Sequence, residues 1–377
     1  MGQPDAVVVG GGVIGLSAAW LAARDGLEIV VVDPTPGKGA SWAAAGMLAP
    51  VTEVHYNEEA LLELNLRAAE AWPGFAAQLE DASGLDVGYR PCGTLAVAAD
   101  AGDRAVLEDL HRFQLELGLA STWCGPADCR RLEALLSPRI RGGILVPGDH
   151  QADPRRLVRA LVTACARAGV TLVEDRVERV LTEGDRVRGV VTVTDCEILS
   201  ANVVLAAGAW MSAVGGLPAG AIPPIRPVKG QILRLRFPPD LPLPERNLRG
   251  IVQGTSLYLV PRLDGELVCG ATVEERGEDR SVTAGAVYAL LRDAQAILPA
   301  LAEAELVETG AGLRPGTPDN APYLGKGALD GLVIASGHYR NGILLAPVSA
   351  SAVAAVLAGK PLPLWAVPFS PDRNPGP

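Results

Sequence analysis

The first 33 residues carry apolar positions in the order of a strand, a helix and a second strand. Residues 7–9 are three consecutive valines, as in a strand that is buried on both faces. Apolar residues then recur at helical spacing from 14 to 22, and Gly26 is a suitable helix end. A second apolar run occupies 29–32. This pattern predicts a βαβ unit.

Helical and strand patterns interleave along the rest of the chain. Helical spacing predicts helices over 58–79, with an interruption or kink near Pro73, and over 101–118, 126–136, 154–168, 283–298 and 347–360. Strand patterns predict a small antiparallel ribbon and a buried strand within 170–210, sheet over 226–273, and a further buried strand over 331–337.

This interleaving predicts an α/β fold with two domains, as the length of 377 residues also suggests. A Rossmann-type, doubly wound domain is expected from three separate segments, 1–85, 150–220 and 305–377. An antiparallel-sheet (α+β) domain is expected as two insertions, 86–149 and 221–304.

Composition and charge exclude several function classes. Hydrophobic residues make up 49% of the chain, so a folded core is expected throughout, with disorder only at the ends, chiefly in the tail 370–377. The net charge is −10 and the basic residues are scattered singly, which argues against nucleic acid as a partner. No apolar run reaches about 18 residues without a charge or a breaker, so no membrane span is expected. The start has no basic leader, and we expect a cytoplasmic protein.

The six cysteines form no C-x-x-C pair and lie near no histidine cluster, so no metal site is predicted. An even number would also suit a disulfide framework. Because no export signal is evident, we favour free thiols.

Gly10, Gly12 and Gly15 form a G-x-G-x-x-G motif between the first strand and the first helix, and Asp33 ends the next strand. Such glycines permit a tight turn, the approach of a pyrophosphate and close helix packing, while the acid accepts hydrogen bonds from ribose hydroxyls. The pattern predicts FAD or NAD and disfavours NADP. The alternative is a βα turn without a ligand.

Four further stretches have features that suit a flat cofactor or a carboxylate. Residues 39–50, GASWAAAGMLAP, and the strand end at Gly208 are rich in small side chains, although an Ala-rich helix start or an ordinary strand end would look the same. In 337–347, GHYRNGILLAP, the start of a helix would favour a bound group with negative charge. The histidine and arginine of this stretch would also suit capping of surface loops. Arg314 lies in a Gly/Pro-rich stretch, and we expect a rigid turn to hold its planar fork for a carboxylate.

Taken in order, these motifs resemble the D-amino acid oxidase superfamily, and within it the FAD-dependent glycine oxidases of thiamine biosynthesis. The resemblance covers nearly the whole chain and rests on VVVGGGVIGLSAAW, AAAGMLAP, PVKGQ, YLVPR, GATVEE, AGLRPGTPDNAPYLG and GHYRNGILLAPV. It implies non-covalently bound FAD in the doubly wound domain and a substrate sheet that covers the flavin.

The resemblance also implies site residues. The FAD contacts would be Gly10, Gly12, Val13, Ile14, Gly15, Asp33, Ser41, Trp42, Ala45, Gly46, Met47, Val177, Gly208, His338, Tyr339, Arg340, Asn341, Gly342, Ile343 and Leu344. Arg314 would bind the substrate carboxylate with help from Tyr258, and Arg340 would lie close to the bound amino acid. No side chain is expected to act as a catalytic base.

The implied reaction is oxidation of glycine, and of sarcosine or small D-amino acids, by hydride transfer to flavin N5. Products would be glyoxylate or another keto acid, ammonia and, with molecular oxygen, hydrogen peroxide. Alternatives are a sarcosine oxidase, a broad D-amino acid oxidase, a dehydrogenase that passes electrons to a quinone, or a flavin-binding protein without turnover. A homo-oligomer is also expected from the resemblance.

Overall fold

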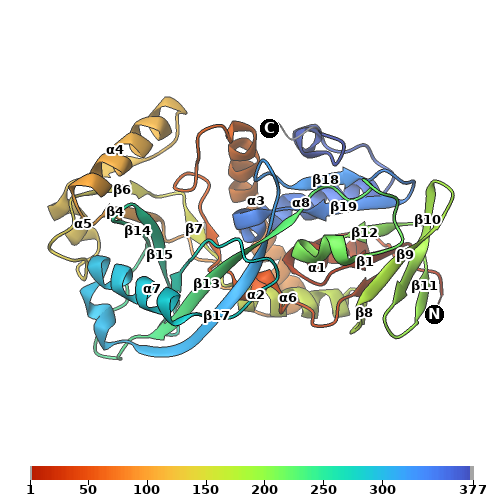
Figure 1. Ribbon diagram of the computed structural model, residues 1–377, viewed down its shortest axis with the longest axis horizontal. Coiled ribbons are helices and arrows are strands. Elements are labelled where there is room, and N and C mark those ends of the chain that lie inside the picture. Colours follow the sequence, from red (N-terminus) through yellow and green to blue (C-terminus); the bar gives the residue numbers. More distant parts are fainter. Residues whose placement is uncertain (1, 374–377) are drawn as a thin grey trace.

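The computed structural model describes residues 2–373, and one of its two large sheets is mainly parallel. Its six strands lie in the order β18-β19-β12-β1-β2-β8, with only β18 antiparallel, on the right in Figure 1. The bounds are β1 Ala6–Val9, β2 Ile29–Val32, β8 Thr171–Val173, β12 Val203–Leu205, β18 Tyr323–Lys326 and β19 Leu332–Ser336.

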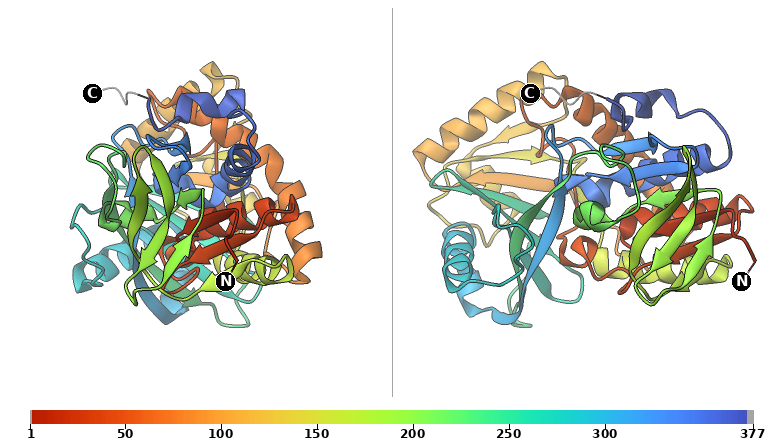
Figure 2. Two further views of the ribbon diagram at one scale, coloured as in Figure 1. Left: turned by 90° about the vertical axis from the view of Figure 1, so that its right-hand side faces the viewer. Right: turned by 45° about the vertical axis from the view of Figure 1, so that its right-hand side comes forward.

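Successive residues of β1 and β2 pack into different cores, which explains their unbroken apolar runs. Ala6 and Val8 belong to a core shared with four helices, α1 Val13–Arg24, α3 Glu59–Ser83, α6 Pro154–Arg167 and α8 Gly342–Leu357. Val7 and Val9 belong to a core shared with a three-stranded ribbon, β9 Val177–Glu183, β10 Arg186–Thr192 and β11 Glu197–Leu199. Helices therefore cover one face of the sheet and the ribbon covers the other (Figure 2).

The other large sheet has eight strands in the order β17-β13-β16-β15-β14-β4-β6-β5. All pairings are antiparallel except that of β14 with β4. The bounds are β4 Thr94–Ala98, β5 Thr122–Cys124, β6 Gly143–Val146, β13 Arg226–Arg236, β14 Asn247–Val252, β15 Thr255–Pro261, β16 Glu266–Gly270 and β17 Glu305–Gly316. Three helices accompany it, α4 Ala101–Glu116, α5 Pro126–Leu132 and α7 Ala284–Ile297.

Short elements connect the two sheets. Residues that follow β2 form helix α2, Ala40–Ala43, and strand β3, Met47–Leu48, which pairs with β7, His150–Gln151. Four 3-10 segments cover Gly208–Ala213, Pro299–Glu303, Tyr339–Asn341 and Leu364–Phe369.

The predicted fold class and the N-terminal βαβ unit are confirmed, with three local differences. The helix containing Pro73 continues unbroken from 59 to 83. The last helix begins at Gly342 instead of 347, because its first apolar residues are buried and helix α8 accommodates Pro347. The Gly/Pro-rich stretch around Arg314 is strand β17 and not a turn.

The domain boundaries stay a prediction, but strand pairing bears on the one at 305. We assigned 305–377 to the doubly wound domain, whereas β17 pairs along its length with β13 in the eight-stranded sheet. Residues 305–316 therefore group with the inserted domain by hydrogen bonding. The repeated glycines of this strand hid its alternating pattern.

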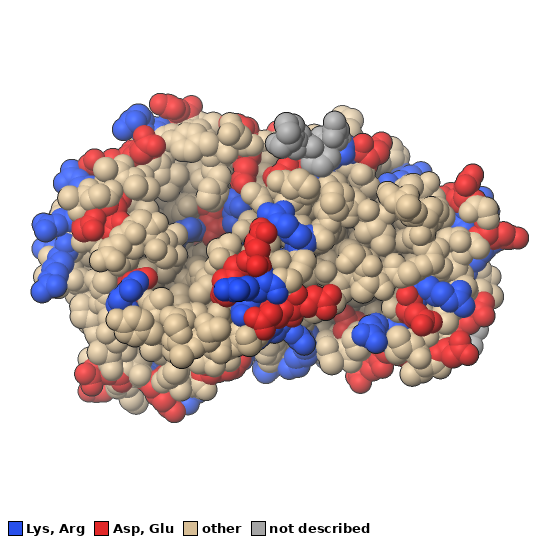
Figure 3. Space-filling model, in the orientation of Figure 1, with Lys and Arg blue, Asp and Glu red and all other residues tan. Residues whose placement is uncertain are grey.

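One helix, Tyr339–Leu357, is long and apolar enough to cross a membrane by length and composition, and 72% of its most apolar window is buried within the protein. Acidic and basic side chains are interspersed on the face seen in Figure 3. All six cysteines are free, and four of them are buried. The end of the tail expected to be disordered, 374–377, lies outside the described residues.

Candidate functional site

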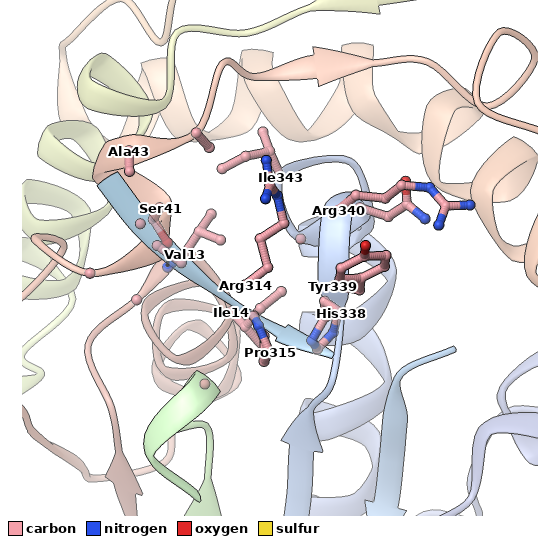
Figure 4. A pocket seen from close by; sticks show the side chains of 18 of the residues that line it. Val13, Ile14, Ser41, Ala43, Arg314, Pro315, His338, Tyr339, Arg340 and Ile343 are labelled. Carbon is pink, nitrogen blue, oxygen red and sulfur yellow. Dashed lines mark hydrogen bonds between the residues drawn. The ribbon is translucent and has the colours of Figure 1, made fainter. Parts of the chain in front are cut away.

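A pocket of about 1380 Å³, its open mouth included, is lined by residues of both large sheets. The six-stranded side contributes the β1–α1 turn, the ends of β2, β12 and β19, and the start of α8. The eight-stranded side contributes β13, β15 and β17, of which β17 carries the labelled Arg314 and Pro315 in Figure 4. Segments from the beginning, middle and end of the chain therefore build one site.

The three motif glycines have distinct steric roles. Gly10 has a φ of +108°, and a Cβ there would lie 2.4 Å from the carbonyl oxygen of Ala206. A Cβ on Gly15 would lie 2.0 Å from the carbonyl oxygen of Gly10, so α1 packs tightly on its own turn. A Cβ on Gly12 would meet only the Ser41 hydroxyl, at 3.4 Å. Gly12 therefore leaves open space where a phosphate would approach the helix start.

Polar side chains fix this turn. Asp33 accepts hydrogen bonds from the Gly11 and Thr35 amides, both at 2.7 Å, and its side chain lines the pocket. The hydroxyl of Ser41 accepts a hydrogen bond of 3.0 Å from the Val13 amide at the start of α1. These contacts hold the helix N-terminus, with its partial positive charge, against the pocket.

The small-residue stretch after β2 brings backbone close to the pocket. Gly46 has a φ of +79°, and a Cβ there would lie 2.0 Å from the Ala152 carbonyl oxygen. Its neighbours Ala45 and Met47 also line the pocket. Arg262 donates a hydrogen bond to the carbonyl oxygen of Ala45 and fixes the segment from the side of the eight-stranded sheet.

The start of α8 forms another wall. His338 is 2% exposed, its Nε2 lies 2.8 Å from the Ser349 hydroxyl, and burial lowers its pKa to about 3, so the imidazole is neutral. Asn341 is 5% exposed, and its Nδ2 is buried without a hydrogen-bond partner within 2–373. Gly342 and Ile343 line the pocket as well. This wall therefore offers a helix N-terminus and an unpaired amide donor.

Arg314 projects from β17 into the pocket (Figure 4). Its guanidinium lies over Gly230 of the neighbouring β13, where a Cβ would come within 2.3 Å of Nη1. Nη1 donates a hydrogen bond of 3.2 Å to the Thr272 carbonyl oxygen. No carboxylate of residues 2–373 lies within 4.0 Å of its nitrogens. A positive charge therefore faces the pocket without an acidic partner.

Tyr258 repeats this arrangement on β15. Its hydroxyl lies over Gly270 of β16, where a Cβ would meet the phenolic oxygen at 2.4 Å. Burial raises the pKa of Tyr258 to about 12, and the nearby charge of Arg314 offsets only part of the shift. The phenol therefore keeps its proton and is available as a hydrogen-bond donor.

Arg340 lines the same pocket but its charge is already paired. One terminal nitrogen donates a hydrogen bond to Glu58, and Nε lies 3.5 Å from a carboxylate oxygen of Glu53. In Figure 4 its guanidinium extends away from Arg314. Direct contact of Arg340 with a substrate therefore stays a prediction.

Most residues predicted from the sequence meet in this pocket. The lining includes Gly10, Gly12, Val13, Ile14, Asp33, Ser41, Ala45, Gly46, Met47, Gly208, Tyr258, Arg314, His338, Tyr339, Arg340, Asn341, Gly342 and Ile343.

Four predicted contacts lie outside the lining. Gly15 is packed beneath the turn, and Val177 is buried under the ribbon at the start of β9. The indole of Trp42 lies beside cationic groups, with Lys38 Nζ 3.3 Å from the ring centroid. The carbonyl oxygen of Leu344 accepts a hydrogen bond of 2.8 Å from Trp72.

Sequence reasoning missed several lining residues, notably Glu53, Gly230 and Gly312. Gly230 lies within the PVKGQ motif, which was a signal for it. Nothing in the local pattern around Glu53 separates it from a surface acid.

The residues present fit FAD. Glycines leave room along the turn, Asp33 stands at the nucleotide end, and two helix N-termini border the lining. The unpaired Nδ2 of Asn341 is a buried donor that an oxygen or ring nitrogen of the cofactor would satisfy. No metal-binding group of three or more His, Cys, Asp or Glu occurs among residues 2–373.

Fold and pocket together define a two-sheet flavoprotein, and residues 5–356 match the family described as "DAO: FAD dependent oxidoreductase". The chain belongs to this family, and FAD is its cofactor. The family resemblance that the motifs predicted is thereby confirmed.

Three relatives narrow the comparison. The bifunctional protein ThiO/ThiG of Trichormus variabilis is 36% identical over 93% of this chain and 52% of that protein, so the chain spans about half its length. Glycine oxidase of Geobacillus kaustophilus is 32% identical over 99% of this chain and 97% of that protein. A crystal structure of glycine oxidase from that organism superposes with a TM-score of 0.91, over 99% of this chain and 100% of the other. Hydrogen cyanide synthase subunit HcnC of Pseudomonas aeruginosa is 30% identical over 98% of this chain and 96% of that protein.

Proposed function

We propose that this protein oxidises glycine, and with it sarcosine or other small amino acids, at the carbon next to the carboxylate. The observation that carries this proposal is the unpaired guanidinium of Arg314 beside a protonated Tyr258, at one end of a pocket whose other residues suit FAD. Relatives with similar sequence and fold are named glycine oxidase, which supports the same substrate class.

Arg314 and Tyr258 position the substrate. The guanidinium forms a bidentate pair with the carboxylate, and the phenol donates a further hydrogen bond to it. Because both side chains lie flat over glycines of adjacent strands, the carboxylate is held at the sheet surface and the α-carbon faces the cofactor side of the pocket. Such fixed placement lowers the barrier without any covalent step by the protein.

When bound, FAD would supply the acceptor for the hydride of the substrate α-carbon, and the two electrons would pass on to molecular oxygen to give hydrogen peroxide. The resulting imine reacts with water to give glyoxylate and ammonia. The groups near Arg314 and Tyr258 offer no effective base for this reaction, because the lowered pKa of His338, about 3, makes its imidazole a weak base and Glu53 is paired with arginines. We therefore propose that the substrate reacts as the neutral amine and that no side chain removes a proton from carbon.

Non-covalent binding of FAD is part of the proposal. The thiol of Cys269 is buried in the core beneath the eight-stranded sheet, and burial raises its pKa to about 12. No cysteine is among the residues that line the pocket in 2–373. We further propose a role in making the thiazole of thiamine, supported by the ThiO/ThiG relatives, and a homo-oligomer in the cytoplasm, as the sequence suggested.

Anaerobic mixing with a substrate panel tests the proposal. Glycine, sarcosine, D-alanine and D-proline are each added to the yellow protein. Loss of the visible absorbance of the oxidised flavin is followed before and after oxygen is admitted. Bleaching by glycine, and recovery with hydrogen peroxide in oxygen, is the expected result.

The other outcomes separate the alternatives. A preference for sarcosine or for D-proline would favour a sarcosine oxidase or a broad D-amino acid oxidase. Bleaching without recovery in oxygen would favour a dehydrogenase that uses a quinone. No bleaching by any amine would contradict the proposed function and favour a flavin-binding protein without turnover.

A further inference from the structure

Three arginines lie at or next to the substrate end of the pocket, and two of them pair with the same glutamate. Glu53 accepts a hydrogen bond of 2.6 Å from Nη1 of Arg249, and its other oxygen lies 3.5 Å from Nε of Arg340. Arg340 is also paired with Glu58. Among these three arginines, only Arg314 has no carboxylate partner within residues 2–373, and it lines the pocket.

Glu53 is held in this place by the fold. The buried carboxylate of Asp149 accepts hydrogen bonds from the amides of Val51 and Thr52, at 3.1 and 2.6 Å, directly before Glu53. The side chains of Glu53 and Arg249 are only 13% and 18% exposed. An ion pair so shielded from water is much stronger than a surface pair.

The same geometry places Glu53 near the residues predicted to bind the substrate. Arg249 on β14 pairs in register with Tyr258 on β15, so both side chains lie on one face of the sheet. Glu53 lines the pocket together with Tyr258 and Arg314. Arg314, Glu53 and Arg249 all act electrostatically on Tyr258, so the negative charge of Glu53 lies near the residues predicted to hold the substrate, with Arg249 and Arg340 paired to it.

We propose that Glu53 sets substrate specificity by restricting the pocket to amino acids with a single carboxylate. This inference rests on the proposed function. One carboxylate neutralises Arg314, and a second would be repelled by Glu53. Without the Glu53 carboxylate, Arg249 and Arg340 would carry more positive charge than their remaining partner Glu58 balances. A second carboxylate on the substrate would then take the place of Glu53. The substrate class admitted would then be amines with two carboxylates.

The test compares glycine with iminodiacetate, which is glycine with a second carboxymethyl group on its nitrogen. In the Glu53→Gln variant, we expect the ratio of kcat/KM for iminodiacetate to that for glycine to rise roughly tenfold or more, as one well-placed charge pair would give. N-ethylglycine, nearly as long but uncharged at that end, should show no such rise.

Two further variants isolate the charge. Glu59→Gln removes one negative charge from the exposed first turn of α3 and should leave the ratio unchanged. Adding Arg249→Met to Glu53→Gln should abolish the gain for iminodiacetate. An unchanged ratio in Glu53→Gln, or an equal gain for N-ethylglycine, overturns the proposal.

Ligand binding to the unmodified holoenzyme tests the same claim without turnover. Acetate and malonate are titrated while the flavin absorption spectrum is recorded. We expect malonate to bind no more tightly than acetate, and tenfold tighter binding of malonate would overturn the role of Glu53 even if the variant failed to fold. Glycine that fails to reduce the flavin while acetate still binds at least as tightly as malonate would contradict the proposed function, but would still support repulsion of a second carboxylate by Glu53.

Discussion

The two ends of the pocket use glycine for different purposes. At the cofactor end, a Cβ on Gly10 would meet the backbone of Ala206 at 2.4 Å. At the substrate end, a Cβ on Gly230 would meet the tip of the flexible Arg314 side chain at 2.3 Å. At the cofactor end, glycine therefore allows two backbone segments to pack closely. At the substrate end, it leaves space on a strand for a side chain from the neighbouring strand.

This difference predicts how each end responds to change. Backbone that meets a new Cβ has no rotamer to move into, so the turn itself must shift and the cofactor site is lost. A side chain that meets a new Cβ moves aside, so the protein remains folded with its cofactor and only the substrate is displaced.

Gly10→Ala should have the largest effect, because it adds both an unfavourable φ and a backbone clash inside the FAD turn. We expect colourless protein that takes up no FAD. The matched control is Gly26→Ala, which has a φ of +91° and no atom within 4 Å of the new Cβ. The control should lose only about 1–2 kcal/mol of stability from the left-handed backbone and stay yellow. Equal FAD content in both variants would contradict a backbone-defined cofactor end.

Arg314→Ala should come next and leave the flavin in place. Loss of a desolvated charge pair should weaken substrate binding by about 3–5 kcal/mol, roughly a hundredfold or more. Arg314→Lys should recover little of this, because a point charge does not reproduce the fork. The measurement is the dissociation constant of glycine from anaerobic flavin reduction, and an unchanged value would refute the carboxylate clamp.

The same contrast explains what the sequence could predict. The cofactor end could be predicted because Gly10, Gly12, Gly15 and Asp33 recur at a fixed spacing within one βαβ unit. Gly15 meets the backbone of Gly10 and Asp33 binds the Gly11 amide inside that unit, although Gly10 itself also packs against the distant Ala206.

The residues of the substrate end could be predicted from the sequence only in part. Arg314 and Tyr258 were identified through family motifs, yet the strand that carries Arg314 was taken for a turn, since its pairing partner β13 lies about 80 residues earlier. Glu53 was missed because its meaning depends on Arg249, 196 positions away. Long-range ion pairs of this kind leave no periodic signal in the chain.

Gly230→Ala tests whether the substrate end can be disturbed without loss of FAD from the cofactor end. The new Cβ would push the Arg314 guanidinium aside by about an ångström, a misplacement that costs up to about a hundredfold in rate. Gly310→Ala on β17 is the matched control, because its Cβ would meet only Glu308, at 4.0 Å. We expect kcat/KM for glycine to fall at least tenfold in the first variant alone, with FAD content equal in both. Loss of FAD in Gly230→Ala would show that the ends are not independent.

The smallest predicted effect is a pH dependence of protein stability that arises from His338, in the wall between the cofactor end and the substrate end. His338 in the folded protein has a pKa lowered to about 3 by burial, below the ordinary value of 6.5. Between about pH 3 and pH 6.5 the unfolded chain therefore binds one more proton than the folded protein. The free energy of unfolding is unaffected by this histidine above pH 6.5 and falls by about 1.4 kcal/mol for each pH unit below it.

Asp149 contributes with the opposite sign, because burial raises its pKa to about 6 from 3.8 and favours the folded state as pH falls through that range. Urea midpoints of the wild type alone would therefore mix the two effects. The difference between the wild type and His338→Gln cancels the Asp149 contribution, since Gln keeps a donor for Ser349 but does not titrate. Between pH 7.5 and 5.5, with saturating FAD, the wild type should lose about 1.4 kcal/mol more than the variant. If the free energies of unfolding of the two proteins changed in parallel with pH, the imidazole would accept a proton in the folded state. This wall of the pocket would then be accessible to water, contrary to the burial of His338.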